Sequence, residues 1–192
     1  MEESLLSLES HGRRLQSLIE GAAFSDREGH PLDHAAGMSR ALAMLEATRA
    51  THRLYLIGNG GSAGIASHIG NDLLKVARLR AMTLHDPSQF SCLANDYGYE
   101  RVFSAALEVA ALPGDVLIAL SSSGRSPNIL NAAEEARRRA CPVFTLSGFT
   151  PDNPLRRAGD LNLWVDAANY GLVEIAHFFV LHVLAERLNP AG

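Results

Sequence analysis

The hydrophobic and polar positions of the chain change their period near residue 53. Before that point, apolar side chains recur at helical spacing over residues 4–21 and 33–50, so two helices are expected first. The stretch from Phe24 to Pro31 between them is polar and is interpreted as a turn. After residue 53, short apolar runs alternate with helical patterns, which predicts a series of strands and helices.

The short apolar runs predict buried strands at 53–57, 80–84, 115–120, 142–146 and 161–165. Helices are predicted between and after them at 62–76, 99–111, 126–140 and 170–188. This alternation favours the α/β class, with a doubly wound parallel sheet as the middle of three layers. The whole chain, 1–192, is expected to be one domain, with an N-terminal helical region at 1–50 and an α/β core at 53–188.

Composition excludes several classes of partner. A net charge of −4 gives no broad basic field for a nucleic-acid backbone, and no window approaches 18 apolar residues, so no membrane span is expected. The basic run at 137–139 falls late in a predicted helix, where cations are favourable. Cys92 and Cys141 are interpreted as buried free thiols, and no signal peptide is recognised, so a cytoplasmic protein is expected.

A glycine-rich loop follows the first predicted strand, with the sequence Gly58-Asn-Gly-Gly-Ser62. Glycines allow the backbone to approach a ligand closely, and the helix that follows offers free N–H groups to an anion. Ser62 is expected at or near the N-cap of that helix. No lysine follows the glycines and the dinucleotide-binding spacing is absent, so nucleotide hydrolysis is not expected. A tight turn without a ligand is the alternative.

A serine-rich loop follows a later predicted strand, with the sequence Ser121-Ser-Ser-Gly-Arg-Ser126. Its hydroxyl and amide groups can surround phosphate oxygens without a full counter-charge. Ligands of parallel sheets bind beyond the carboxyl ends of the strands, where both loops are expected. Together the loops predict a sugar phosphate site. A serine-rich turn with Ser126 as N-cap is the alternative for this loop alone.

Four motifs occur in one order along the chain: Gly58–Ala63, Asn95–Tyr99, Gly114–Ser126 and a last helix that carries histidines. They resemble the sugar isomerase (SIS) fold, and within it the phosphoheptose isomerases, over about residues 30–188. The resemblance implies conversion of sedoheptulose 7-phosphate to a heptose 7-phosphate. It also implies a homotetramer with active sites at subunit interfaces, and a zinc ion in each subunit.

The resemblance assigns roles to individual positions. Those that match the family's substrate and phosphate-binding residues are Asn59, Gly60, Ser62, Asp96, Ser121, Ser122, Ser123 and Ser126. Those that match its metal ligands are His68, Asp72, Glu174 and His182. Among the latter, Asp72, Glu174 and His182 are the candidate catalytic residues, with a carboxylate as base and His182 as acid.

The residue types support part of this chemistry without the family. His68 and Asp72 share one face of a helix and can bind one metal, although a surface hydrogen-bonded pair is the common alternative. Glu174, His177 and His182 interrupt an apolar helix, where ionisable groups are costly unless they are paired or act as ligands. For His177, a core histidine bonded to a carbonyl is the plain alternative. Eight residues separate Glu174 from His182, about 12 Å along a straight helix, so a shared metal requires leaning side chains or ligands from different subunits.

Aldose–ketose isomerisation requires one group that moves a proton between adjacent carbons and another that protonates or polarises the carbonyl oxygen. A carboxylate and a histidine in a dry pocket can do this through an enediol, and zinc could stabilise the enediolate oxygens. Three positions depart from the family: Asp72 is shorter than its glutamate, Glu174 replaces a neutral glutamine, and Gly171 replaces a frequent aspartate. The base and the exact sugar therefore stay open, as does a non-catalytic SIS module that binds a phosphosugar or a protein partner.

Overall fold

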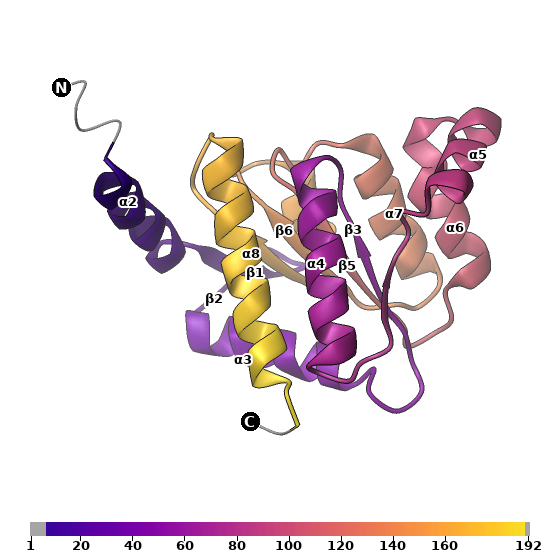
Figure 1. Cartoon of the computed structure of the whole chain (residues 1–192), viewed down its shortest axis with the longest axis horizontal. Helices are drawn as coiled ribbons and strands as arrows, with labels where there is room; N and C mark the ends of the chain where they lie inside the picture. The colour runs from indigo at the N-terminus through magenta and orange to yellow at the C-terminus, as the bar shows by residue number, and fades with distance from the viewer. Residues whose placement is uncertain (1–6, 191–192) are drawn as a thin grey trace.

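The computed structural model describes residues 7–190, and within them a sheet with the strand order β2-β1-β7-β6-β5-β3-β4 lies between two layers of helices (Figure 1). Five strands are mutually parallel, as the alternating pattern predicts: β3 (Leu54–Ile57), β4 (Ala81–Thr83), β5 (Val116–Ser121), β6 (Val143–Ser147) and β7 (Leu161–Trp164). The three-layer α/β class is confirmed.

Alternate strand residues enter two separate cores, one on each face of the sheet. Leu54 and Leu56 face the layer that contains α3 (His34–Glu46), α4 (Gly61–Lys75) and α8 (Tyr170–Arg187). Tyr55 and Ile57 face the layer that contains α6 (Val102–Ala110) and α7 (Pro127–Arg138). Because both faces are covered, β3 is apolar along its whole length and β5 up to its last residue, and the polar loops follow at the strand ends.

The prediction of a turn between the first two helices is wrong in part, because this stretch forms a β-hairpin. β1 (Ala23–Asp26) pairs antiparallel with β2 (Pro31–Leu32) and with β7, where Phe24 lies opposite Leu163. Pairing with an existing sheet edge and burial of Phe24 override a local sequence that is too short and polar to signal a strand. The helix before it, α2, spans Leu8–Glu20, and residues 4–6 of the predicted helix lie outside the described residues.

One helix is missing from the sequence prediction, which has a helix only at about 99–111. The structure has α5 (Pro87–Tyr97), then a short 3-10 turn η1 (Tyr99–Arg101) and α6. Asp86 caps α5 by accepting a hydrogen bond from the Gln89 amide at 2.8 Å, and Pro87 occupies its first turn. None of its residues is buried, so the hydrophobic pattern gives no signal for it.

The cysteine prediction is correct for one residue and wrong for the other. Cys141 is buried and free, and burial raises its pKa to about 11. Cys92 is also free but lies exposed on α5, because that helix covers the outside of the layer. Among the described residues, no helix has both the length and the apolar character of a membrane span.

A buried histidine on α8 makes the stability of the fold depend on pH. Burial lowers the pKa of His177 to about 4 from 6.5, so the unfolded chain takes up the proton first. The contribution of this group to stability is therefore complete above about pH 6.5 and decreases as the pH falls towards 4. We expect the free energy of unfolding to lose about 2 kcal/mol between pH 7 and pH 5 through this residue. Urea titrations of the wild type and of His177→Gln measure it, and parallel losses in both proteins would contradict the assignment.

Candidate active site

The two predicted loops lie at the carboxyl ends of β3 and β5 and line one cavity of about 320 Å³. Ligands of parallel α/β sheets bind at this edge. The cavity is lined by polar backbone and hydroxyl groups together with one carboxylate: Asn59, Gly60, Gly61, Ser62, Leu120, Ser121, Ser122, Ser123, Ser126, Tyr170 and Glu174. Seven of the eight positions predicted to bind substrate or phosphate are among them, and Asp96 is not.

The first loop brings the start of α4 unusually close to the end of β3. A Cβ atom on Gly58 would lie 2.6 Å from the carbonyl carbon and oxygen of Ser62, so only glycine fits there. Gly60 occupies the N-cap position with a φ of 53°, which also favours glycine. Ser62, predicted at or near the N-cap, is buried as the second residue of α4. The first amides of a helix have no intrahelical partner, so this loop offers N–H donors to an anion.

The second loop folds back on itself so that its hydroxyl groups converge. The Oγ atoms of Ser121 and Ser126 are 3.2 Å apart, and the Gly124 amide donates to the Ser121 carbonyl at 2.9 Å. Ser126 occupies the N-cap of α7, but its hydroxyl contacts Ser121 and makes no capping bond. The Ser122 hydroxyl is buried without a hydrogen-bond partner. A buried polar atom without a partner is costly, so Ser122 is a natural site for a ligand oxygen.

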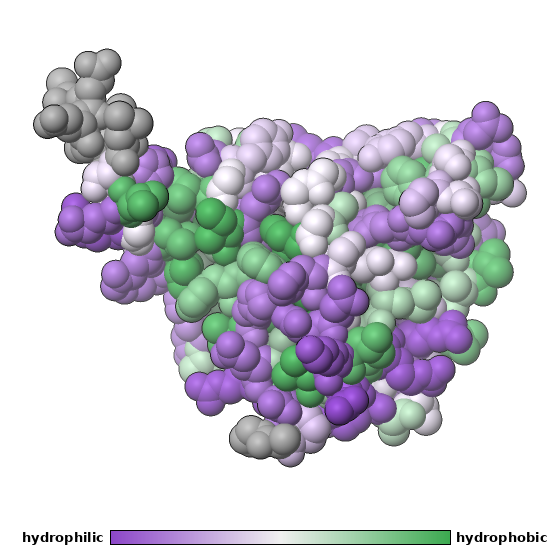
Figure 2. Space-filling view, viewed as in Figure 1, coloured by the Kyte–Doolittle hydropathy of each residue, from purple (hydrophilic) through white to green (hydrophobic). Residues whose placement is uncertain are grey.

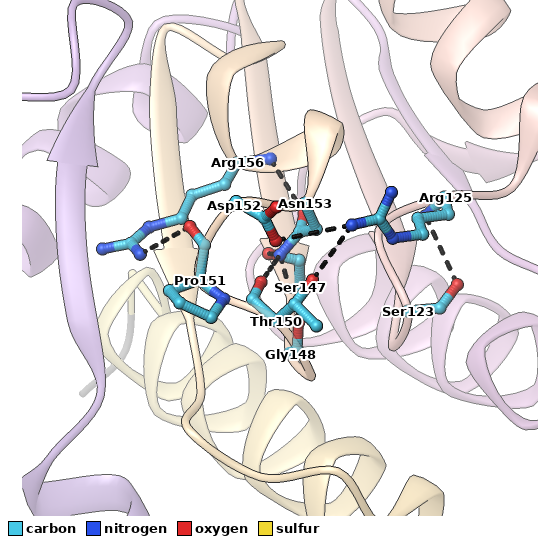
Figure 3. Close-up of polar contacts among 9 residues, drawn as sticks. All are labelled: Ser123, Arg125, Ser147, Gly148, Thr150, Pro151, Asp152, Asn153 and Arg156. Carbon is cyan, nitrogen blue, oxygen red and sulfur yellow. Dashed lines mark hydrogen bonds and ion pairs between the residues drawn. The ribbon is translucent and has the colours of Figure 1, made fainter.

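The loop after β6, which carries the short helix η2 (Pro154–Arg157), supports the serine loop from the outside (Figure 3). The buried Asn153 side chain donates to the Ser147 hydroxyl at 3.2 Å and to the Gly148 carbonyl at 3.1 Å. Arg125 of the serine loop reaches Asp152 at 3.4 Å. Sequence reasoning missed Asn153 because this stretch appears as a loose loop, with no periodicity to mark a buried side chain.

Side chains on the far side of the glycine loop also hold it in place. Asn59 exchanges amide hydrogen bonds with Asn128 at 3.0 and 2.9 Å and accepts one from the Tyr99 hydroxyl at 3.0 Å. His85 donates to the Gly58 carbonyl at 3.1 Å, and burial lowers the pKa of its imidazole. Sequence reasoning missed His85, although its position just after β4 is the kind of strand end at which functional residues gather.

Three of the four predicted metal ligands come together between α4 and α8. The Asp72 Oδ2 atom lies 3.4 Å from His68 Nε2 and 3.3 Å from His182 Nδ1. One ligand atom from each of the three residues lies within 4.8 Å of the others. Two imidazoles and one carboxylate are a donor set that zinc accepts in catalytic sites with an open position. The residues present therefore fit a zinc ion.

The fourth predicted ligand, Glu174, lies apart from these three residues and lines the cavity between the two loops. A Cβ atom on Gly61 would be 2.3 Å from its carboxylate, so Glu174 packs against the start of α4. Burial raises the pKa of this carboxyl group. The separation from His182 is the one expected for two residues more than two turns apart on a helix.

Helices α4 and α8 lie side by side and run in the same direction (Figure 1). Glu174 meets Gly61 at the start of both helices, whereas His182 meets His68 and Asp72 further along. The seam, which is the line of contact between the two helices, thus runs from the cavity at Glu174 to the cluster of His68, Asp72 and His182.

Asp96 is not brought to the cavity. It lies exposed on α5 and accepts hydrogen bonds from the side chains of Asn95 at 2.9 Å and Cys92 at 3.6 Å.

Comparisons with known proteins agree with this architecture. The sequence profile of the SIS domain family matches residues 23–148, and the chain belongs to that family. The chain is 33% identical over 149 residues to the phosphoheptose isomerase of Trichlorobacter lovleyi, covering 74% of this chain and 76% of that protein. It is 34% identical over 179 residues to the phosphoheptose isomerase of Colwellia psychrerythraea, covering 89% of each. By these relationships it is a phosphoheptose-type sugar phosphate isomerase.

A solved structure of phosphoheptose isomerase from Neisseria gonorrhoeae shares the fold. Its TM-score is 0.82 at 24% sequence identity, and the match covers 98% of this chain and 99% of that one.

Proposed function

We propose that the protein interconverts an aldose and a ketose sugar phosphate, with sedoheptulose 7-phosphate and heptose 7-phosphate as the pair it serves best. The observation that carries this proposal is the composition of the cavity. The serine loop contributes converging hydroxyl groups to it, and Glu174, packed against the start of α4, is the single carboxylate of the lining, with a pKa raised by burial. The phosphoheptose isomerases to which the chain is similar support the choice of sugar.

Charge orients the substrate in this cavity. A phosphate dianion is repelled by Glu174 and attracted by the hydroxyl and amide donors of Ser121–Ser126, so it binds at the serine end. The carbon chain then extends towards Glu174 and the seam between α4 and α8. This arrangement brings the carbonyl end of the sugar to the titratable residues.

The chemistry requires a base and an acid close to the substrate. Glu174 is assigned as the base that takes the proton from the carbon beside the carbonyl and returns it to the neighbouring carbon, because a raised pKa brings a carboxylate closer to the working pH. His182 is assigned as the group that protonates the carbonyl oxygen and then recovers a proton from the hydroxyl of the neighbouring carbon, and its contact with Asp72 orients the imidazole. Because it lies about 12 Å along α8 from Glu174, His182 would reach the substrate from a neighbouring subunit. Asp72 is the other candidate base, but it already lies between two histidines.

A zinc ion is part of this proposal. His68, Asp72 and His182 would hold it, and zinc when bound stabilises negative charge on substrate oxygens.

The experiment that tests the function is an exchange assay with purified protein. Turnover of seven-, six- and five-carbon ketose phosphates is followed by incorporation of solvent deuterium, and the seven-carbon substrate is expected to react fastest. Removal of metal by a chelator is expected to lower turnover, and zinc is expected to restore it. Undiminished turnover in metal-free protein would exclude the zinc role. Tight binding of the sugar phosphate without any exchange would favour a non-catalytic SIS module.

We also propose that the protein is a homotetramer that completes its sites between subunits. His68 is half exposed, and the apolar side chains of Ile175 and Phe179 are exposed nearby on α8. Figure 2 shows hydrophobic residues gathered on this face, between α8 and α2. Light scattering on the purified protein is expected to give the mass of four chains, and a fully active monomer at assay concentration would contradict the proposal.

A cytoplasmic location is proposed on the state of the cysteines. Both are free, and the exposed Cys92 thiol would be open to oxidation in an oxidising compartment.

A further inference from the structure

His177 is a buried titratable group that the proposed reaction does not use. Its side chain has no exposed surface, and its Nε2 atom lies 3.0 Å from the Ser147 carbonyl oxygen. Because a carbonyl only accepts, Nε2 carries the proton. The Nδ1 atom is then an unprotonated nitrogen, and it is buried without a partner. The ring is therefore a fixed, neutral donor that reaches from α8 to the end of β6.

The peptide group that receives this hydrogen bond also holds the serine loop. The Ser147 carbonyl belongs to the same peptide unit as the Gly148 amide, and that amide donates to the Ser122 carbonyl at 2.9 Å. One rigid peptide thus has His177 on one side and Ser122 on the other. Ser122 is the serine whose buried hydroxyl has no partner, and it lines the proposed phosphate site.

Helix α8 packs directly on this peptide. A Cβ atom on Gly148 would lie 2.8 Å from both methyl groups of Val173, one turn before His177. Asn153 holds the two residues that flank this peptide, because its side chain donates to the Ser147 hydroxyl and to the Gly148 carbonyl (Figure 3). Helix α8 therefore contacts the serine loop through this peptide, here called the joint.

We propose that His177 is a positioning residue, which ties α8, the helix of Glu174 and His182, to the phosphate-binding serine loop through the Ser147–Gly148 peptide. The inference rests on the proposed function for the identity of the ligand only. Loss of the imidazole donor leaves a buried carbonyl with one hydrogen bond fewer, and the joint loosens. The affinity for phosphate then falls, and the position of Glu174 relative to the substrate becomes less well defined.

Two variants of the full-length protein test the proposal. His177→Leu removes the donor and keeps the bulk, whereas His177→Gln keeps an N–H donor at a similar reach. For His177→Leu we expect the Gly148 amide and the amides of 121–126 to exchange with solvent about tenfold faster, and the affinity for inorganic phosphate to fall about tenfold. For His177→Gln we expect both quantities to return to near the wild-type values. The KM for the sugar phosphate should follow the phosphate affinity.

The matched control is Leu184→Ala, a change to another fully buried side chain of α8 further from the joint. It is expected to lower global stability without a selective effect on the Gly148 amide or on phosphate affinity. If His177→Leu behaves like Leu184→Ala, or if His177→Gln fails to restore the Gly148 amide, the positioning role is overturned. Exchange and phosphate binding do not require turnover. A protein that fails to isomerise any sugar would refute the proposed function and still allow these measurements to decide the role of His177.

Discussion

Replacement of Glu174 by glutamine is expected to reduce kcat by a factor on the order of 10²–10⁴, the usual contribution of a positioned general base. The change keeps the shape of the side chain and its contact with Gly61, but it removes the group that takes the proton. Because the amide is neutral, the phosphate should bind at least as well as before, so KM should not rise. Deuterium incorporation from solvent measures the proton-transfer step directly.

This variant also decides between the two candidate bases. Glutamine is the residue that the resemblance places at this position, so an active Glu174→Gln protein together with an inactive Asp72→Asn protein would move the base to Asp72. Glu186→Gln is the matched control, since Glu186 is exposed on the same helix and is expected to leave turnover unchanged. Zinc content is measured in every variant, so that loss of the metal is not mistaken for loss of the base.

Replacement of Gly58 by alanine is expected to cost about 2–4 kcal/mol of stability and to weaken phosphate binding at least about tenfold. The added methyl group would lie 2.6 Å from backbone atoms of Ser62, which no side-chain rotation can relieve. The start of α4 must therefore move, and the amides that face the cavity move with it. Thermal unfolding and phosphate titration measure the two effects.

Gly64→Ala provides the control within the same helix. A methyl group at this position meets nothing within 4 Å, and alanine is favoured over glycine in a helix by about 1 kcal/mol. This variant is expected to be at least as stable as the wild type and to bind phosphate normally. Equal behaviour of the Gly58 and Gly64 variants would show that the close approach at the loop is not needed for binding.

The parts of the fold that the sequence predicts are those with a strong local pattern. The apolar runs of β3, β5 and β6 and the helical period of α7 are visible without any tertiary information. The hairpin of β1 and β2 is not, because its strands are stabilised by pairing with β7, which is distant in sequence. Helix α5 is not visible either, since it buries none of its residues.

The residues of the candidate site also differ in whether the sequence can predict them. The serine and glycine loops could be predicted because strand ends and helix starts are marked in the sequence, and His68 and Asp72 because they are four residues apart on one helix. The position of Glu174 could not be derived from spacing, since it depends on how α8 packs against α4. Asn153 and His85 act through contacts with backbone groups of distant loops, and no local pattern announces such contacts.

The division of the site between strand-end loops and two helices affects how such a site can change during evolution. The groups that would hold the phosphate belong to loops at strand ends, whereas Glu174, His182, His68 and Asp72 belong to the two helices. Substitutions along the helices can therefore alter the reacting end without rebuilding the anchor. The departures that the resemblance implies at Asp72 and Glu174 lie on these helices, so the sugar or the reaction can change while the phosphate site is kept.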